Sequence, residues 1–392
     1  MLNWTGTSVS RLVSTQRDSD LLTLTQDFAH EQLAPVAADC EEREEFPRAL
    51  IRELGALGLL TLPYSEIILK DQDAKVPYTV SLQVLEEISR AWLTVGMSMS
   101  VHHLACAPLI KFGTAGQKER WQDTILSGTT LGAYCLSEPD SGSDAAAMTT
   151  RAVKEGDTYR INGTKAWITH AGIADFYTVM VRTGNEKTRG ISCFFVPADT
   201  PGLEFGPPEH KMGGNASPTG LVHLKDVVLT SEHLIGQEGQ GFPIALASLD
   251  VGRLGIAAGS VGLAQAALDA ALTYSGDREQ FGHTIDQFQG VAFMLADMAT
   301  AIATARSTYL DAAQRLDHNF DYGSLAAISK LAASDAAMKV TTDAVQIFGA
   351  NGYTKDYPVE RYMREAKVLQ IVEGTSQIQR VVISRALSKH VD

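Results

Sequence analysis

A β-rich stretch lies between two long helical regions, and this order constrains the fold more than any other feature of the sequence. From Thr130 the residues favour strands, as in Phe176–Val181 and Ile191–Val196, where branched and aromatic side chains dominate. Asn162-Gly163 favours a tight hairpin turn between two further strands. Several short strands in succession predict a small antiparallel β-barrel.

Helical periodicity fills the sequence on both sides of this stretch. Apolar residues recur at helical spacing from about Leu21, and helices resume after Gly239-Gln240-Gly241. Steps of three and four predict the seam of a long antiparallel bundle at Phe288, Val291, Leu295, Met298, Ile302, Ala305, Tyr309, Ala312 and Leu316. The sequence therefore predicts a mainly α protein with a central β domain: a flexible tail at 1–20, an N-terminal α-helical domain at 21–129, a central β-barrel domain at 130–236 and a C-terminal helical bundle at 237–392.

Charge and cysteine content exclude several classes of partner and site. The 392 residues carry a formal net charge of -13, which argues against a nucleic-acid partner. No basic cluster suggests an anionic membrane surface, and no apolar run is expected to span a bilayer. The cysteines, Cys40, Cys106, Cys135 and Cys193, lack metal-ligand spacing and predict free thiols in a reducing compartment with no metal site.

One carboxylate near the C-terminus stands in an unusual setting. Glu373 follows an apolar run and precedes Gly374-Thr375-Ser376, a pattern that ends one helix, turns on glycine and starts another helix capped by Thr375 or Ser376. A carboxylate on such a turn can point into a cavity, as a general base often does. A solvated helix-end residue is the alternative that the residues alone leave open.

Standard nucleotide motifs do not accompany this carboxylate. Gly259-Ser260-Val261-Gly262 lies in a helical pattern and does not complete GxGxxG, and Gly113 to Lys118 has the wrong spacing for a phosphate loop. The segment YCLSEPDSGSD, from Tyr134 to Asp144, instead ends a strand in a loop rich in hydroxyls and backbone N–H groups. By itself such a segment could also be a plain turn.

Two segments together resemble the acyl-CoA dehydrogenase family. The sequence QIFGANGYTKDYPVERYMREAKVLQIVEGTSQIQR at 346–380 is similar to the C-terminal signature of the family, and YCLSEPDSGSD is similar to its other signature. The resemblance covers nearly the whole chain and is closest to the short-chain (butyryl) branch. It implies an α domain, a central β-barrel and a four-helix bundle, with FAD between the β domain and the bundle and its adenine end reaching a neighbouring subunit.

The resemblance also assigns residues to the flavin ring and the substrate. Tyr134, Leu136 and Ser137 would lie along the isoalloxazine, and Ser143 toward the substrate or the pyrophosphate. Trp167 would lie against the ring and Thr169 near the reactive nitrogen N5, although Trp167 alone reads as a core aromatic. The positions implied to line the acyl-CoA cleft are Asp250, Arg253 and Gly374; an intrahelical pair is the alternative for the first two.

The remaining cofactor positions lie later in the chain. Arg278, in DREQFG, resembles the arginine that reaches the FAD pyrophosphate of the adjacent subunit, and a solvated helix-end cation is its alternative. The other positions that match FAD contacts are Gln280, Phe281, Gln289, Gln346, Gly349, Thr375 and Gln377.

By resemblance, Glu373 is the base that removes the proton α to a thioester. The carbonyl oxygen would be held by the Glu373 backbone N–H and an FAD ribityl hydroxyl, and hydride would pass from the β-carbon to N5 to give a trans-2-enoyl thioester. Some relatives carry the base at the position of Gly252. Glycine cannot serve, so Glu373 is the only matching candidate.

The implied protein is an FAD-dependent acyl-CoA dehydrogenase of fatty acid β-oxidation, acting on a short-chain or branched-chain acyl-CoA. It would form a homotetramer, pass electrons to an electron-transferring flavoprotein, and be cytoplasmic in a bacterium or in the mitochondrial matrix of a eukaryote. An acyl-carrier-protein dehydrogenase, an acyl-CoA oxidase and a non-catalytic acyl-thioester-binding homologue are the alternatives. The segment Val95 to Lys111 is expected to close the pocket floor, with Met97, Met99 and His102 on it. The 64–78 loop is longer than in the family pattern, and it leaves the length of the substrate's acyl chain open.

Overall fold

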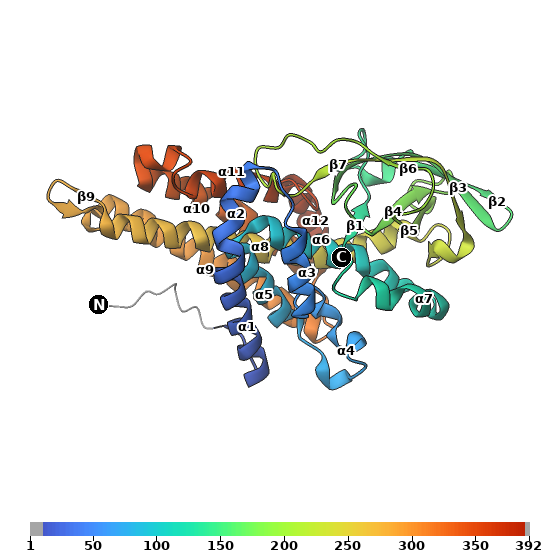
Figure 1. Ribbon diagram of the computed structural model, residues 1–392, viewed down its shortest axis with the longest axis horizontal. Helices are drawn as coiled ribbons and strands as arrows, with labels where there is room; N and C mark the ends of the chain where they lie inside the picture. Colours follow the sequence, from blue (N-terminus) through green and yellow to red (C-terminus); the bar gives the residue numbers. More distant parts are fainter. Residues whose placement is uncertain (1–10, 389–392) are drawn as a thin grey trace.

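The computed structural model describes residues 11–388 and has the predicted order of helices, sheet and helices (Figure 1). The N-terminal helices are α1 (Gln16–Phe28), α2 (Ala34–Glu42), α3 (Arg48–Ala56), α4 (Ser65–Ile68), α5 (Tyr78–Ala91), α6 (Leu93–Phe112) and α7 (Ala115–Ile125), with a π-helical turn at Ala29–Leu33 and 3-10 turns at Leu62–Tyr64 and Gln72–Ala74.

Helix α1 begins inside the stretch that was predicted as a flexible tail. Thr15 accepts a hydrogen bond from the Asp18 backbone N–H at 3.1 Å, and the Asp18 carboxylate accepts one from the Thr15 N–H at 3.2 Å. This reciprocal pair is a capping box, which satisfies N–H groups that have no partner inside the helix. Residues 1–10 of the predicted tail lie outside the described part of the chain.

The central region is one sheet of eight strands, at one end of the molecule (Figure 1). The strands are β1 (Gly132–Cys135), β2 (Arg151–Glu155), β3 (Thr158–Thr169), β4 (Phe176–Arg182), β5 (Ile191–Pro197), β6 (Leu203–Phe205), β7 (Thr219–Thr230) and β8 (Leu234–Ile235). Their order is β6-β7-β3-β2-β4-β5-β8, with β1 beside β4. The pairing is antiparallel, except that β1 and β2 each pair parallel with β4.

The hairpin predicted at Asn162-Gly163 is wrong. Both residues lie inside β3, at a register shift against β7 between Ile161 and Gly163. Gly163 has a φ of 151°, so the glycine serves a bulge within a long strand rather than a turn. The chain reverses instead between β2 and β3, where Glu155 pairs with Thr158.

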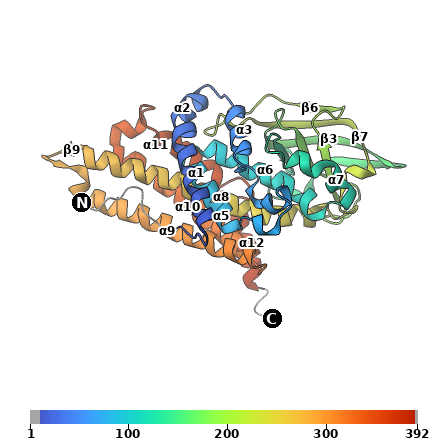
Figure 2. The ribbon, with the colours of Figure 1, turned by 60° about the horizontal axis from the view of Figure 1, so that its bottom comes forward.

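The C-terminal region is a helical bundle whose long helices extend from the end marked by β9 toward the sheet (Figure 2). It consists of α8 (Gly241–Asp277), α9 (Gln289–Asp317), α10 (Gly323–Phe348), α11 (Val359–Leu369) and α12 (Ser376–Ser388). Between α8 and α9 the short strands β9 (Glu279–Gln280) and β10 (His283–Thr284) form a hairpin. The predicted seam of α9 is confirmed, because its buried residues include Leu295, Met298, Ile302, Ala305, Tyr309 and Ala312.

Helix α8 is the centre of the helical part and packs against α5, α6, α9 and α10. Its small residues permit this: a Cβ at Gly262 would overlap the carbonyl oxygen of Glu86 on α5. Helices α6 and α8 are also apolar and long enough to cross a membrane, contrary to the sequence-based expectation. In both helices, however, the most apolar segment is largely buried inside the protein (83% of it in α6 and 72% in α8), as expected for core helices.

Candidate active site

Glu373 occupies a strained turn between α11 and α12. Its φ is 52°, in the left-handed region, and that of Gly374 is 95°. Helix α12 begins directly afterwards, and Thr375 caps it by accepting a hydrogen bond from the Ile378 N–H at 3.2 Å. The predicted helix, turn and helix are confirmed, and Thr375 rather than Ser376 is the cap.

The carboxylate of Glu373 is enclosed even though the residue as a whole is half-buried. Within residues 11–388, neither of its oxygens has a hydrogen-bond partner. Burial raises the pKa of Glu373 to about 7, against the opposing effects of Lys330 and Arg253. An enclosed acid of this pKa, without a structural partner, suits a proton acceptor near neutral pH and contradicts the solvated helix-end interpretation.

Gly252 on α8 makes room for this carboxylate. A Cβ at Gly252 would overlap Oε2 of Glu373. The sequence argument that Gly252 cannot itself be a base therefore gains a second, steric meaning. A side chain at position 252 and the carboxylate of Glu373 would occupy the same space, so only one of them can be present.

Replacing Gly252 by alanine is expected to lower kcat by roughly 100-fold, because a displacement of about 1 Å at a reacting group has an effect of that size. The variant should retain its fold, since alanine favours a helix more than glycine does. Steady-state kinetics of the reaction that the family resemblance implies would measure this, with Gly276→Ala as the control, since a Cβ at Gly276 meets nothing within 4 Å. An unchanged kcat would show that the Glu373 carboxylate need not occupy this space.

The loop after β1 is fixed by a buried ion pair that the sequence analysis did not single out. Lys165 on β3 is fully buried; its Nζ lies 2.9 Å from Oε1 of Glu138 and donates to the Leu136 carbonyl at 3.1 Å. Glu138 also accepts hydrogen bonds from Thr149 and Thr150. Burial would raise the pKa of Glu138, but Lys165 and these hydrogen bonds outweigh it and lower the pKa to about 2.

This ion pair connects the two segments assigned to the flavin ring. The Ala166 N–H also donates to the Ser137 carbonyl at 2.9 Å, so the two segments are joined by their backbones as well. This backbone bond and the ion pair join the residues that follow β1 to the end of β3. The signal was present in the sequence, since Glu138 lies in YCLSEPDSGSD and Lys165 lies two residues before Trp167, but pairing them requires the fold.

Trp167 is not the core aromatic that its residue type suggests. It lies at a second register shift of β3, between Lys165 and Ile168, with a φ of 61°. The bulge turns the indole outward, so that 64% of the residue is exposed. Left-handed backbone at a bulky residue is uncommon and marks functional sites more often than others. Thr169, two residues on, is half-buried and pairs with Thr219 on β7.

The other residues predicted around the ring differ in exposure. Tyr134 is buried, and its hydroxyl has no hydrogen-bond partner in the described part of the chain. Its pKa is raised by burial and, to a smaller extent, by Cys193 and Glu373. Leu136 and Ser137 are half-buried, whereas Ser143 is exposed. Downstream of the base, Thr375 is half-buried and Gln377 is exposed.

A second set of predicted cofactor residues lies far from Glu373. Arg278 follows the end of α8, and Gln280 and Phe281 belong to the hairpin at the end of the molecule opposite the sheet (Figure 1). Arg278 lies 26 residues beyond Gly252 on one continuous helix, which at 1.5 Å per residue places it roughly 40 Å away. Exposed residues dominate this set, which also includes Gln289, Gln346 and Gly349.

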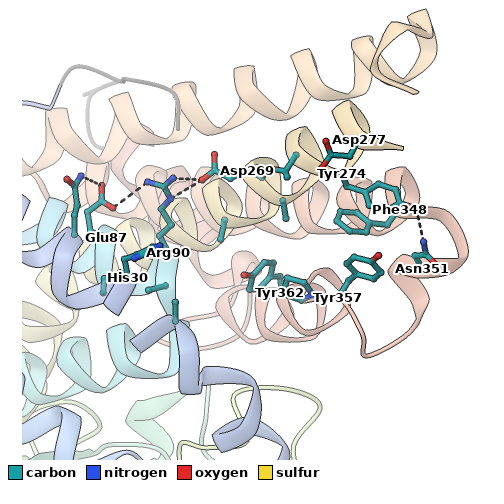
Figure 3. Close-up of a pocket in the computed structure, with 18 of the residues that line it drawn as sticks. His30, Glu87, Arg90, Asp269, Tyr274, Asp277, Phe348, Asn351, Tyr357 and Tyr362 are labelled. Carbon is teal, nitrogen blue, oxygen red and sulfur yellow. Dashed lines mark hydrogen bonds and ion pairs between the residues drawn. The ribbon is translucent and has the colours of Figure 1, made fainter. Parts of the chain in front are cut away.

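A groove lies beside Arg278, away from Glu373. It has a volume of about 1080 Å³ and is lined by residues of α1, α5, α8, α10 and α11 (Figure 3). Tyr274 stacks on Phe348 with ring centroids 4.1 Å apart and accepts a hydrogen bond from Asn351 at 2.8 Å. These contacts hold the Gly349 turn against the end of α8.

Asp250 and Arg253 form the intrahelical pair that was the alternative interpretation. Arg253 donates to Oδ1 of Asp250 at 2.6 Å. Arg253 is buried, and its Nε has no partner within residues 11–388. Arg253 also opposes the rise that burial causes in the pKa of Glu373.

A small cavity adjoins the other side of Gly252. It has a volume of about 20 Å³ and lies among α5, α6 and α8, room for about one water molecule. From α6 the side chains that line it are those of Ser100, His103, Leu104 and Ala107. Met97, Met99 and His102 do not line this cavity. That α6 closes the floor of the substrate pocket stays a prediction.

The ends of the unusual 64–78 loop reach this cavity, which the sequence did not indicate. Pro63 and Tyr78 both line it. Asp317, at the end of α9, accepts hydrogen bonds from the Tyr78 N–H at 2.6 Å and the Thr79 N–H at 3.0 Å, and so caps α5. The loop is thus fixed to the bundle at the wall of the cavity.

Comparisons with known proteins agree with this geometry. Models of the acyl-CoA dehydrogenase N-terminal, middle and C-terminal domains match residues 15–129, 133–227 and 239–388. The chain belongs to the acyl-CoA dehydrogenase family. As a member, it is an FAD-dependent oxidoreductase.

Similar members of the acyl-CoA dehydrogenase family include a short-chain specific acyl-CoA dehydrogenase of Clostridium acetobutylicum, which is 42% identical over 94% of this chain and 97% of its own. Among solved structures, butyryl-CoA dehydrogenase from Megasphaera elsdenii has a TM-score of 0.93 and 39% identity, covering 96% of this chain and 99% of its own. A chain from a structure described as the electron transferring flavoprotein of Acidaminococcus fermentans has a TM-score of 0.93 and 41% identity over 96% and 99%.

The residues present fit FAD, the cofactor of this dehydrogenase family. The exposed indole of Trp167 offers a surface for a flat aromatic ring. The enclosed Tyr134 hydroxyl and Glu373 carboxylate, both without partners among the described residues, leave polar atoms for bound molecules to satisfy.

Proposed function

We propose that this acyl-CoA dehydrogenase introduces the α,β double bond into a short-chain or branched-chain acyl-CoA, with Glu373 as the catalytic base. The observation that carries the proposal is the enclosed carboxylate of Glu373, which has no hydrogen-bond partner within residues 11–388. Its pKa of about 7, raised by burial, lies near the value at which a general base works best at neutral pH.

In the proposed reaction, Glu373 takes the proton from the carbon α to the thioester. FAD, when bound, supplies the acceptor for the hydride that leaves the β-carbon. Before proton transfer, Lys330 and Arg253 favour the ionised carboxylate, and enclosure of the site favours the neutral acid that is formed. The residues that would hold the reactive end of FAD are Tyr134, Leu136, Ser137, Trp167, Thr169, Thr375 and Gln377, with Ser143 toward the substrate or pyrophosphate and Gly374 beside the thioester.

A second copy of the chain would complete the cofactor site. The distance of roughly 40 Å along α8 between Gly252 and Arg278 supports this, because one chain presents the two sets of assigned residues at opposite ends. In this proposal, Arg278, Gln280, Phe281, Gln289, Gln346 and Gly349 bind the far end of FAD in a neighbouring subunit. A homotetramer, built from such pairs, is the assembly that we propose.

Short chains are favoured by the small cavity and by the relatives. The cavity beside Gly252 has a volume of only about 20 Å³, so any acyl chain that enters it must displace side chains of α5, α6 or α8, and a longer chain must displace more of them. Two of the similar proteins are described as short-chain specific and butyryl-CoA enzymes. The likeness to a chain from an electron-transferring flavoprotein structure supports such a flavoprotein as electron acceptor. A cytoplasmic or mitochondrial matrix location would suit this chemistry.

A dye-reduction assay over acyl-CoAs from butyryl to palmitoyl, with branched members, tests the substrate. We expect the highest kcat/KM for chains of about four to six carbons, and a loss of roughly tenfold or more for further methylenes that the floor cannot accommodate. Equal activity on palmitoyl-CoA would contradict the short-chain proposal. If no CoA ester reacted and FAD remained bound, the same acyl groups on an acyl carrier protein would be assayed, and activity there would replace the CoA proposal.

A further inference from the structure

Lys330 lies beneath the turn that carries Glu373. It projects from α10, is fully buried, and its Nζ donates a hydrogen bond to the Gly374 carbonyl at 2.9 Å. Resting on the proposed role of Glu373, we propose that Lys330 is a positioning residue for the reaction. It holds the Glu373-Gly374 turn through the Gly374 carbonyl, and its ammonium charge keeps the Glu373 carboxylate ionised until the substrate proton arrives.

The turn needs such a hold because its backbone is strained. Glu373 has a left-handed φ of 52° without being glycine, a conformation that persists only when the surroundings enforce it. Gln379, on α12, donates to the carbonyls of Glu373 at 3.2 Å and Gly374 at 2.9 Å. Lys330 and Gln379 therefore meet at the Gly374 oxygen from two different helices.

Asp335, further along α10, holds both flanks of the same turn. Its carboxylate accepts hydrogen bonds from Gln370, before the turn, at 2.7 Å, and from the Ser376 hydroxyl, after it, at 3.3 Å. It also pairs with Arg380 at 3.0 Å. Helix α10 thus fixes the turn at its base through Lys330 and at its two ends through Asp335.

The other charged groups around the turn are paired with one another, whereas Lys330 acts mainly on Glu373. The groups that act on Glu373 are Lys330 from α10 and Arg253 from α8, and Tyr134 from β1 stands nearby. Arg253 is paired with Asp250, and Asp335 with Arg380. Among the acids, Glu373 has the largest effect on Lys330, followed by Asp335.

Burial shifts the pKa values of Lys330 and Glu373 in opposite directions. Burial lowers the pKa of Lys330 to about 8, although Glu373 and Asp335 oppose this. Burial raises the pKa of Glu373 to about 7. The proposed base requires the state in which Lys330 is protonated and Glu373 is ionised, and each charge favours the other.

The test compares Lys330→Met with the wild-type enzyme in the pH dependence of kcat/KM for butyryl-CoA. The wild type should gain activity as pH rises through about 7. We call this rise of kcat/KM with pH the limb of the profile. In Lys330→Met the limb should lie about one pH unit higher, because a neighbouring cation that favours the ionised Glu373 carboxylate has been removed. Lys339→Met, at an exposed lysine of the same helix paired with Asp343, should leave the limb in place.

Exchange of the α-protons of an acyl-CoA analogue with D2O, followed by NMR, gives a second measurement of proton removal alone. Its pH dependence should shift with that of kcat/KM in Lys330→Met. An identical limb in wild type and Lys330→Met, in both measurements, would overturn the proposal. If Glu373→Gln still exchanged α-protons at the wild-type rate, the proposed base itself would be wrong, whatever the Lys330 variants did.

Two further variants separate the charge from the hydrogen bond. Lys330→Gln keeps a donor for the Gly374 carbonyl but loses the charge, so its limb should shift as in Lys330→Met, and it also serves if the methionine variant does not fold. Gln379→Leu removes a neutral donor from the same carbonyl and should lower kcat without moving the limb. A limb that moved equally in Gln379→Leu and Lys330→Gln would overturn the electrostatic role.

Discussion

Replacing Glu373 by glutamine is expected to lower kcat by roughly 1000-fold, the middle of the range for loss of a positioned general base. Glutamine has the same shape but cannot accept the proton. The fold and the bound FAD should be retained, because the carboxylate oxygens of Glu373 make no hydrogen bond within residues 11–388 that the change could break. Stopped-flow reduction of the flavin by butyryl-CoA would measure the chemical step.

The stability of this variant distinguishes lost chemistry from misfolding. The pKa of Glu373 is raised by burial to about 7 from an ordinary value of 4.5. Its contribution to stability is therefore fully present below pH 4.5 and is lost as pH rises through about 7. Glutamine has no such charge to bury, so Glu373→Gln should unfold at a higher temperature than the wild type above pH 7. Glu119→Gln, at an exposed acid of α7, is the control. Wild-type flavin reduction in Glu373→Gln would contradict its role as the base.

Replacing Lys165 by methionine is expected to lower the free energy of unfolding by about 3–5 kcal/mol, because Glu138 is left buried without its cation. The loop from Leu136 to Ser137 should loosen as well, since Lys165 also donates to the Leu136 carbonyl. Chemical denaturation would measure the stability, and the fraction of purified protein that retains FAD would measure the loop.

A matched control and a second change sharpen this prediction. Lys154→Met, on the adjacent strand β2, removes an exposed ion pair with Glu238 and should destabilise the protein far less than Lys165→Met does, because exposed ion pairs contribute little to stability. Adding Glu138→Gln to Lys165→Met should restore part of the lost stability, because the unpaired charge is then gone. Equal destabilisation by Lys165→Met and Lys154→Met would contradict the importance of the buried pair.

Local patterns in the sequence predicted much of the fold. The spacing of Leu295, Met298 and Ile302 predicted the buried face of α9, and Gly374-Thr375 predicted the turn and cap before α12. Both signals depend on residues a few positions apart. Where two local interpretations competed, the sequence could mislead: Asn162-Gly163 has the composition of a hairpin turn, but the strand continues through it because β7 pairs on both sides of the bulge.

Side-chain exposure at the site was less predictable. Trp167 reads as a core residue, yet the bulge in β3 turns it outward. The spacing of Met97, Met99 and His102 did not reveal which residues of α6 face the cavity, and Ser100 and His103 do so. A helix or strand pattern gives the period of a face, but the neighbouring elements decide what that face meets.

The order of the three regions, the family resemblance and the choice of Glu373 as the candidate base follow from the amino-acid sequence alone. The folded chain adds that this carboxylate is enclosed, that Gly252 makes room for it and that Lys330 supports its turn. The reason is the range of the interactions. Helix caps and periodicity act within a few residues, whereas Lys330 reaches a carbonyl 44 residues away and Lys165 an acid 27 residues away. Burial and charge pairing of this kind exist only once the helices and the sheet have packed together.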